Sequence, residues 1–103
     1  MMRMILALVA LAAAGVAHAE TSNERMARCA AQSEIVTQAL EIRARGRNEN
    51  RAIRQITRAR ADLDAPYTEA ISPLVGWIFS LNAAELEADV AGEFRAACEG
   101  YKP

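Results

Sequence analysis

Histidine is almost absent from this chain of 103 residues. The one histidine, His18, lies in the segment that we expect to be removed from the mature protein. Without histidine a chain has no Ser-His or Cys-His nucleophile, no histidine-ligated zinc and no ordinary proton shuttle near neutral pH. Glycine-rich phosphate loops and Asp/Asn-rich calcium loops are also missing. These absences predict a protein that is not an enzyme, with no catalytic residues, no metal site and no cofactor.

Cysteine is scarce as well, and its two copies are Cys29 and Cys98. They lie too far apart in the sequence for a C-x-x-C redox site. Outside the reducing cytosol a lone pair of cysteines favours one disulfide. That bond would close a loop of about 70 residues, which the chain-entropy model values at roughly 4 kcal/mol. Two free thiols or an intermolecular bridge are the alternatives.

Residues 1–19 have the three parts of a secretory signal peptide. Arg3 supplies the early positive charge, eleven apolar residues follow from Met4 to Ala14, and Ala17-His18-Ala19 is a small-x-small end. The apolar run is shorter than the about 20 residues that a membrane-spanning helix needs. We therefore expect cleavage after Ala19 and a periplasmic or secreted protein. An uncleaved membrane anchor and a buried amino-terminal helix are the alternatives.

Residues 20–103 then form a single helical domain of 84 residues with a net charge of −2. A chain this short buries only about 60% of the surface that its unfolded form exposes. Its core is therefore marginal by itself, and a disulfide would supply stability that the core lacks.

The first predicted helix runs over 20–45 and ends at Gly46, which suits a left-handed C-cap. Ile35 and Ile42 lie away from its main apolar stripe. They are either two partly exposed isoleucines or a second contact surface, toward another helix or a partner. The stripe itself recurs at three- and four-residue steps. Its members are Met26, Cys29, Ala30, Ser33, Val36, Thr37, Leu40 and Ala44.

Three further helical segments are predicted from capping signals and breaks. The second helix covers 49–63 after an Asn48 cap, and the last helix runs from an Asn82 capping box to about Glu99. Between them, a helix that begins near Pro66 is kinked or split at Pro73.

The run 74–81 is apolar on all sides, which predicts a centrally buried helix. Trp77 and Phe79 in this run are assigned to the core. A strand over 75–79 is the alternative. The predicted fold is all-α: a small bundle of three to four helices, one of them kinked or split at Pro73, stapled by one disulfide.

Charge is unevenly distributed along the chain. Residues 43–60 carry a net charge of +6, and residues 61–103 carry −6. Within the basic run, Arg47, Arg51, Arg54 and Arg58 fall on one helical face, which we call the arginine stripe. Arginine forks suit carboxylate and phosphate groups. The stripe is therefore a candidate binding site, and pairing with the chain's own acidic last helix is the alternative.

Three acids of that last helix, Glu85, Asp89 and Glu93, recur at four-residue steps. Paired carboxylates can act as acid and base when one is buried enough to hold its proton. Here they would line the polar face of an amphipathic helix, so a solvated surface is the better interpretation.

The pattern resembles small, mostly uncharacterised exported helical proteins of Gram-negative bacteria with one cysteine early and one near the end. The resemblance covers the mature chain and depends on the signal peptide, Cys29, the Leu40-x-x-x-Ala44-x-Gly46 helix end and Cys98. In size, export and its single cysteine pair the chain is also similar to the acid-stress periplasmic chaperones, although no motif carries over residue by residue.

Together these features predict a protein-binding module of the inhibitor, immunity or adaptor type, with an acidic protein as its partner. An acid-stress chaperone, triggered by carboxylate protonation, is one alternative. Attachment to an anionic membrane surface is another. Nucleic acid is not expected, because export makes it scarce and the stripe carries no aromatic side chains for base stacking. The oligomeric state is left open by the sequence.

Overall fold

The computed structural model describes residues 19–101, and this part of the chain is α-helical without strands. The expected signal peptide lies outside the described residues, apart from Ala19. Four longer helices form the fold, and two single-turn helices connect them. The elements are α2 (Ser22–Ala44), α3 (Glu49–Ala59), α4 (Ala65–Thr68), α5 (Ile71–Ser80), α6 (Ala83–Leu86) and α7 (Val90–Glu99). The predicted all-α bundle is confirmed, and the alternative strand over 75–79 is wrong.

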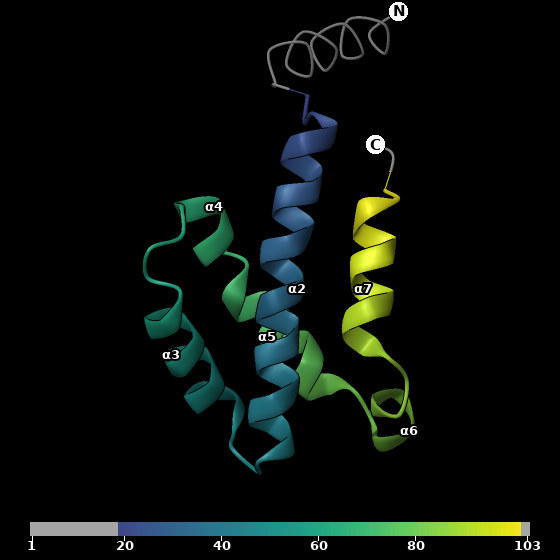
Figure 1. The fold of residues 1–103 in the computed structure, drawn as a ribbon. Helices are drawn as coiled ribbons and strands as arrows, with labels where there is room; N and C mark the ends of the chain where they lie inside the picture. The colour runs from purple at the N-terminus through teal and green to yellow at the C-terminus, as the bar shows by residue number, and fades with distance from the viewer. Residues whose placement is uncertain (1–18, 102–103) are drawn as a thin grey trace, which may run out of the picture.

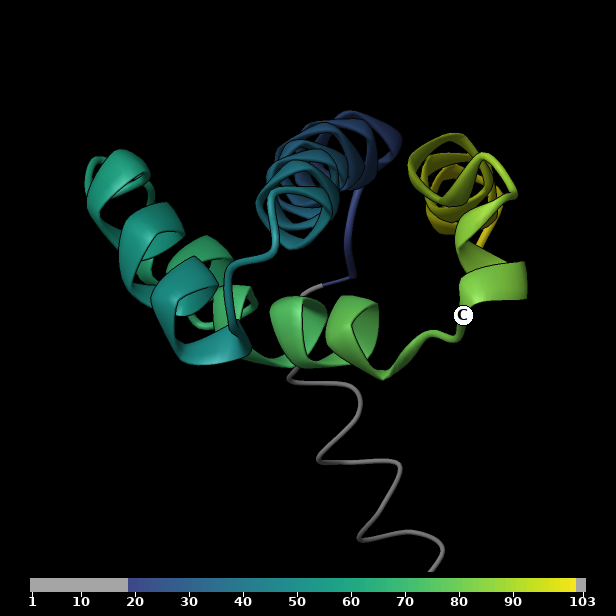
Figure 2. The ribbon, with the colours of Figure 1, turned by 90° about the horizontal axis from the view of Figure 1, so that it is seen from below.

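The longest helix, α2, lies between two edges of the molecule. In Figure 1, α3 lies on one side of α2 and α7 on the other. Figure 2 shows α5 running beneath α2 and linking the two edges. Helix α2 packs against α7, α5 and α3, and α3 also packs against α5. The core therefore sits where α2, α3 and α5 meet, and α7 is attached chiefly to α2.

The core is built from small and β-branched side chains. Ile35 and Ile42 are both buried, which decides between the two alternatives in favour of a second contact surface on α2, here toward other helices. Met26, by contrast, is 49% exposed, so its assignment to the buried stripe is wrong. The buried cluster consists of Ile35, Val36, Ala39, Ile42, Ala52, Ile56, Ile71, Val75, Ile78 and Val90.

Capping residues set the ends of α2 and α3. Thr21 and Glu24 form a capping box, in which the Glu24 N–H donates to Thr21 Oγ1 at 3.1 Å and the Thr21 N–H donates to Glu24 Oε1 at 2.8 Å. Gly46 has a φ of 81°, which confirms the left-handed turn after α2. Asn48 Oδ1 then accepts from the Arg51 N–H at 2.8 Å and starts α3. Helix α3 ends at Ala59 rather than at Leu63.

The predicted kink is present, and it lies one turn before Pro73. Helix α4 ends at Thr68 and α5 begins at Ile71, so Pro73 occupies the first turn of α5, where its missing N–H does little harm. In a continuous helix its ring would meet the carbonyl of Glu69, four residues earlier. The chain therefore breaks at 69–70, and the Leu74 N–H donates to the Ala70 carbonyl at 3.1 Å as α5 begins.

The last predicted helix is wrong as a single element, because 87–89 separates α6 from α7. The Asn82 capping box starts α6 as expected. Asp89 then caps α7, and its Oδ1 accepts from the Gly92 N–H at 3.1 Å. A Cβ at position 92 would collide with the Asp89 carboxylate, so Gly92 gives this cap its space. Asp89 therefore shares no continuous helical face with Glu85 and Glu93.

Candidate functional site

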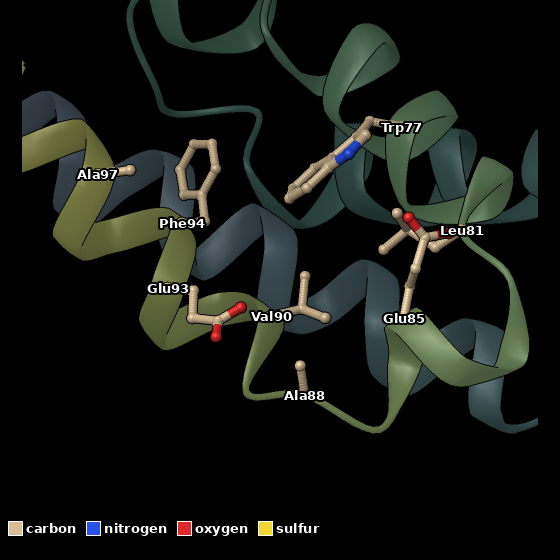
Figure 3. Close-up of a pocket in the computed structure, with 8 residues that line it drawn as sticks. All are labelled: Trp77, Leu81, Glu85, Ala88, Val90, Glu93, Phe94 and Ala97. Atoms are coloured by element: carbon tan, nitrogen blue, oxygen red, sulfur yellow. The ribbon is translucent and has the colours of Figure 1, made fainter.

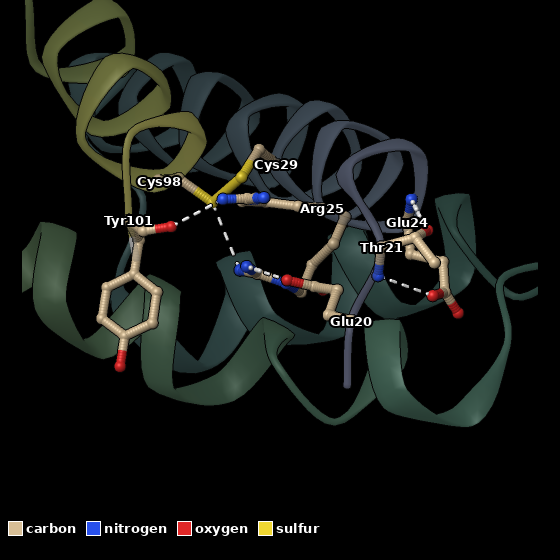
Figure 4. A network of polar contacts seen from close by, with 8 residues as sticks. Glu20, Thr21, Glu24, Arg25, Cys29, Cys98 and Tyr101 are labelled. Atoms are coloured by element: carbon tan, nitrogen blue, oxygen red, sulfur yellow. Dashed lines mark hydrogen bonds and ion pairs between the residues drawn. A yellow bond between two sulfur atoms is a disulfide. The ribbon is translucent and has the colours of Figure 1, made fainter. Parts of the chain in front are cut away.

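Cys29 and Cys98 form the disulfide that the sequence predicts, and neither is a free thiol. The bond joins the amino-terminal part of α2 to the last turn of α7, with 5.7 Å between the two Cα atoms (Figure 4). Cys29 is fully buried. Residues 69 positions apart in the sequence are thus held side by side, and α7 is fixed along α2.

A set of polar contacts surrounds this disulfide. Arg28 donates to both carboxylate oxygens of Glu20, at 2.7 and 3.0 Å, and its Nη1 lies 3.2 Å from Cys98 Sγ. Arg25 Nη1 donates to the Tyr101 carbonyl at 2.8 Å (Figure 4). The hydrogen bond from Arg28 holds the pKa of the Glu20 carboxyl below its usual value. These contacts tie the end of α7 to the start of α2.

Three arginines of the stripe, Arg51, Arg54 and Arg58, lie on the exposed side of α3, whereas Arg47 lies before the Asn48 cap, outside the helix. All four arginines of the stripe are exposed. Within residues 19–101 none of their side chains makes a hydrogen bond or an ion pair. A shallow hollow of about 450 Å³ is lined by three of them together with Gln55. The structure therefore brings Arg51, Arg54 and Arg58 together on one open, basic surface, and Arg47 is not part of this lining.

Two other arginines of the basic run, Arg43 and Arg60, have internal roles, whereas Arg45 is exposed. Arg60 Nη1 donates to Glu34 Oε2 at 2.8 Å. Arg43 donates to the Ile78 carbonyl, and its guanidinium carbon lies 5.8 Å from the centre of the Phe79 ring. The acids of α7 are on the opposite side of α2 from α3 (Figure 1), and no described ion pair connects them with the stripe. Intramolecular pairing thus accounts for Arg43 and Arg60 but not for the stripe.

A second surface feature was not predicted from the sequence. It is a hollow of about 470 Å³ between α5, α6 and α7, which we call the α5–α7 groove (Figure 3). The rings of Trp77 and Phe94 lie in it with their centres 5.7 Å apart and their planes at 38°. Trp77 is 38% exposed, so its assignment to the core is wrong. The lining consists of Trp77, Leu81, Glu85, Ala88, Val90, Glu93, Phe94 and Ala97.

The groove could not be found from periodicity, because it depends on the break at 87–89. If α6 and α7 were one helix, Glu85 and Glu93 would stand on its solvated face. The break instead places both carboxylates along an apolar hollow. The one signal in the sequence was Asp89. The aspartate side chain hydrogen-bonds to nearby backbone groups, which disfavours helix interiors and favours N-caps.

Comparison of the chain with protein-family models, with curated proteins and with solved structures finds no match. No helix within residues 19–101 is long and apolar enough to cross a membrane. In the same range, no group of three or more His, Cys, Asp or Glu side chains is arranged to hold a metal ion.

Proposed function

We propose that this protein is an exported, non-enzymatic binding module of the inhibitor, immunity or adaptor type, which recognises an acidic protein through the arginine stripe. The observation that carries the proposal is the open stripe itself. Its four guanidinium groups are exposed, three of them on α3, and none has an acidic partner in the described part of the chain. Like charges at this spacing disfavour a helix by about 0.2–0.5 kcal/mol per pair, so an external acidic surface would relieve a real repulsion.

The dimensions of the stripe support a protein partner. From Arg51 to Arg58 the part of the stripe on α3 covers about two helical turns, or roughly 10 Å. Each guanidinium offers a planar pair of donors that matches a carboxylate. A row of carboxylates on a partner helix has a similar rise and could meet several of these forks at once. The disulfide supports the exported location, because such bonds persist in oxidising compartments.

The test is recovery of cross-linked partners from the envelope fraction of the native host. The variant Arg51→Glu/Arg54→Glu/Arg58→Glu should lower the recovery of the main partner about tenfold or more, since it replaces attraction with repulsion. Arg45→Glu is the matched control, because Arg45 is exposed just outside the stripe. The triple lysine variant of the same positions keeps the charge, and a partial loss there would indicate recognition by arginine forks.

Two outcomes would contradict the proposal. Recovery of the same partners by the charge-reversed protein would show that the stripe is not the site. Salt-sensitive binding of the wild type to acidic lipid vesicles, with no protein recovered, would favour the membrane-surface alternative instead. Circular dichroism of each variant shows whether the helices survive the substitutions.

A further inference from the structure

The α5–α7 groove has the composition of a binding site with a defined preference. Its lining is apolar apart from Glu85 and Glu93, and it contains no basic side chain. Its volume of about 470 Å³ falls within the usual range for ligand sites. Residues 77–94, which contribute most of the lining, include four acids and no lysine or arginine. The electrostatic field at this groove therefore favours a cation.

The groove continues along α7 rather than closing. A second hollow of about 480 Å³ shares Phe94 and Ala97 with it and extends to Tyr101, which is 58% exposed. Arg28 is the only cation that lines the second hollow, and its charge is paired with Glu20. The two hollows together follow the ten residues of α7, a length of about 15 Å. This elongated shape suits a peptide segment better than a compact ligand.

We infer that the α5–α7 groove binds a basic, apolar peptide segment of a partner protein. Apolar side chains of the segment pack on Phe94 and Ala97, and its lysine or arginine lies between the Glu85 and Glu93 carboxylates beside the Trp77 ring. Glu93 has no partner in the described residues, and a cation over tryptophan gains further attraction. This site is separate from the arginine stripe, has the opposite charge and lies across α2 from it.

The protein contains its own reporter for this test, because Trp77 is its only tryptophan. The probe is a synthetic peptide of leucine and lysine, about 12 residues long, which as a helix would cover α7. Titration of the wild-type protein should shift and saturate the emission of Trp77. A peptide with glutamate in place of lysine should bind at least about tenfold more weakly, because like charges would meet at the two carboxylates.

Matched variants separate groove binding from general attraction to an acidic protein. Ala97→Gln places bulk where the two hollows meet and should weaken binding about tenfold, whereas Ala96→Gln, on the same helix but outside both linings, should not. Glu85→Gln/Glu93→Gln keeps the shape, and glutamine preserves the Asn82 capping box. It should weaken the lysine peptide more than Glu41→Gln/Glu69→Gln, which removes two exposed acids elsewhere.

Three results would overturn the inference. Equal binding by Ala97→Gln and Ala96→Gln would place the peptide elsewhere, and so would an emission that does not change. A concentration-dependent shift without peptide would show that a second copy of the chain fills the groove. The charge-reversed stripe variant should bind the peptide as the wild type does, so this proposal can fail while the proposed function stands.

Discussion

Helices α3 and α7 form the two edges of the molecule on either side of α2, and they are held there by different means (Figure 2). Helix α3 buries Ala52 and Ile56 completely and packs on both α2 and α5. Helix α7 buries only Val90 in the core, packs Ala91 and Phe94 against the edge of the core, and carries the disulfide to Cys29.

The comparison explains why the two outer surfaces differ. Helix α3 is held by its apolar side, so its outer side is free to carry the exposed arginines. Helix α7 packs on α2 and is also held by a covalent bond, so Phe94 can stay half-buried at the edge of the core, where it lines the groove. In a domain of this size, where burial is limited, the staple adds stability while aromatic surface stays exposed.

Removal of the disulfide is the change with the largest expected effect, and it should destabilise α7 more than α3. We expect Cys29→Ser/Cys98→Ser to lower the free energy of unfolding by about 4 kcal/mol, the chain-entropy value for a loop of this length. Chemical denaturation measures the loss, and hydrogen exchange locates it. Amides of α7 should lose protection first, whereas those of α3 should keep more of theirs.

Reduction of the wild-type protein provides the control, because it breaks the same bond without a substitution. If α3 and α7 lost protection to the same extent, the two edges would form one cooperative unit. The contrast between burial and covalent attachment would then be wrong.

Truncation of a buried side chain on each edge helix tests how much apolar burial stabilises α3 and α7. Ile56→Ala should cost about 3 kcal/mol, since Ile56 is fully buried and its loss leaves a cavity. Val90→Ala on α7 removes less volume at a site that retains some exposure, and should cost about 1.5 kcal/mol. Urea unfolding with the disulfide intact measures both. Equal costs would mean that apolar burial holds α7 as firmly as it holds α3.

The sequence predicts the parts of this fold that depend on local chemistry. Asn48 and Gly46 mark helix ends because their side chain and backbone act within a few residues. The pairing of Cys29 with Cys98 follows because no other intramolecular pair exists. Most of the arginine stripe also follows from helical spacing alone, since Arg51, Arg54 and Arg58 lie together on α3, but Arg47 falls before the helix begins.

What the sequence leaves undecided depends on contacts between helices. The spacing of Leu86, Val90 and Phe94 continues through 87–89, so periodicity cannot reveal the break that the Asp89 cap creates. Trp77 lies on a helix that is apolar on all sides, and only the position of α7 decides which side stays open. For the same reason the α5–α7 groove, unlike the stripe, required the structure.

The smallest expected effect comes from the polar contact beside the disulfide. Glu20 accepts two hydrogen bonds from Arg28, and these bonds lower the pKa of its carboxyl in the folded protein. A lowered folded-state pKa contributes stability above the unfolded value, which is roughly 4, and the contribution disappears as pH falls through the folded value. The melting temperature of Glu20→Gln should therefore lie below that of the wild type at about pH 6 and approach it near pH 3.

The difference should be small, because exposed ion pairs contribute little to stability. Glu41→Gln is the control for the loss of one acid, since Glu41 is exposed on α2 without an ion pair in the described structure. A difference between Glu20→Gln and the wild type that stayed constant from pH 6 to pH 3 would mean that titration of Glu20 is not linked to folding. The amino-terminal end of α2 would then be held to α7 by the disulfide and by Arg25, which donates to the Tyr101 carbonyl, without help from the Arg28 pair.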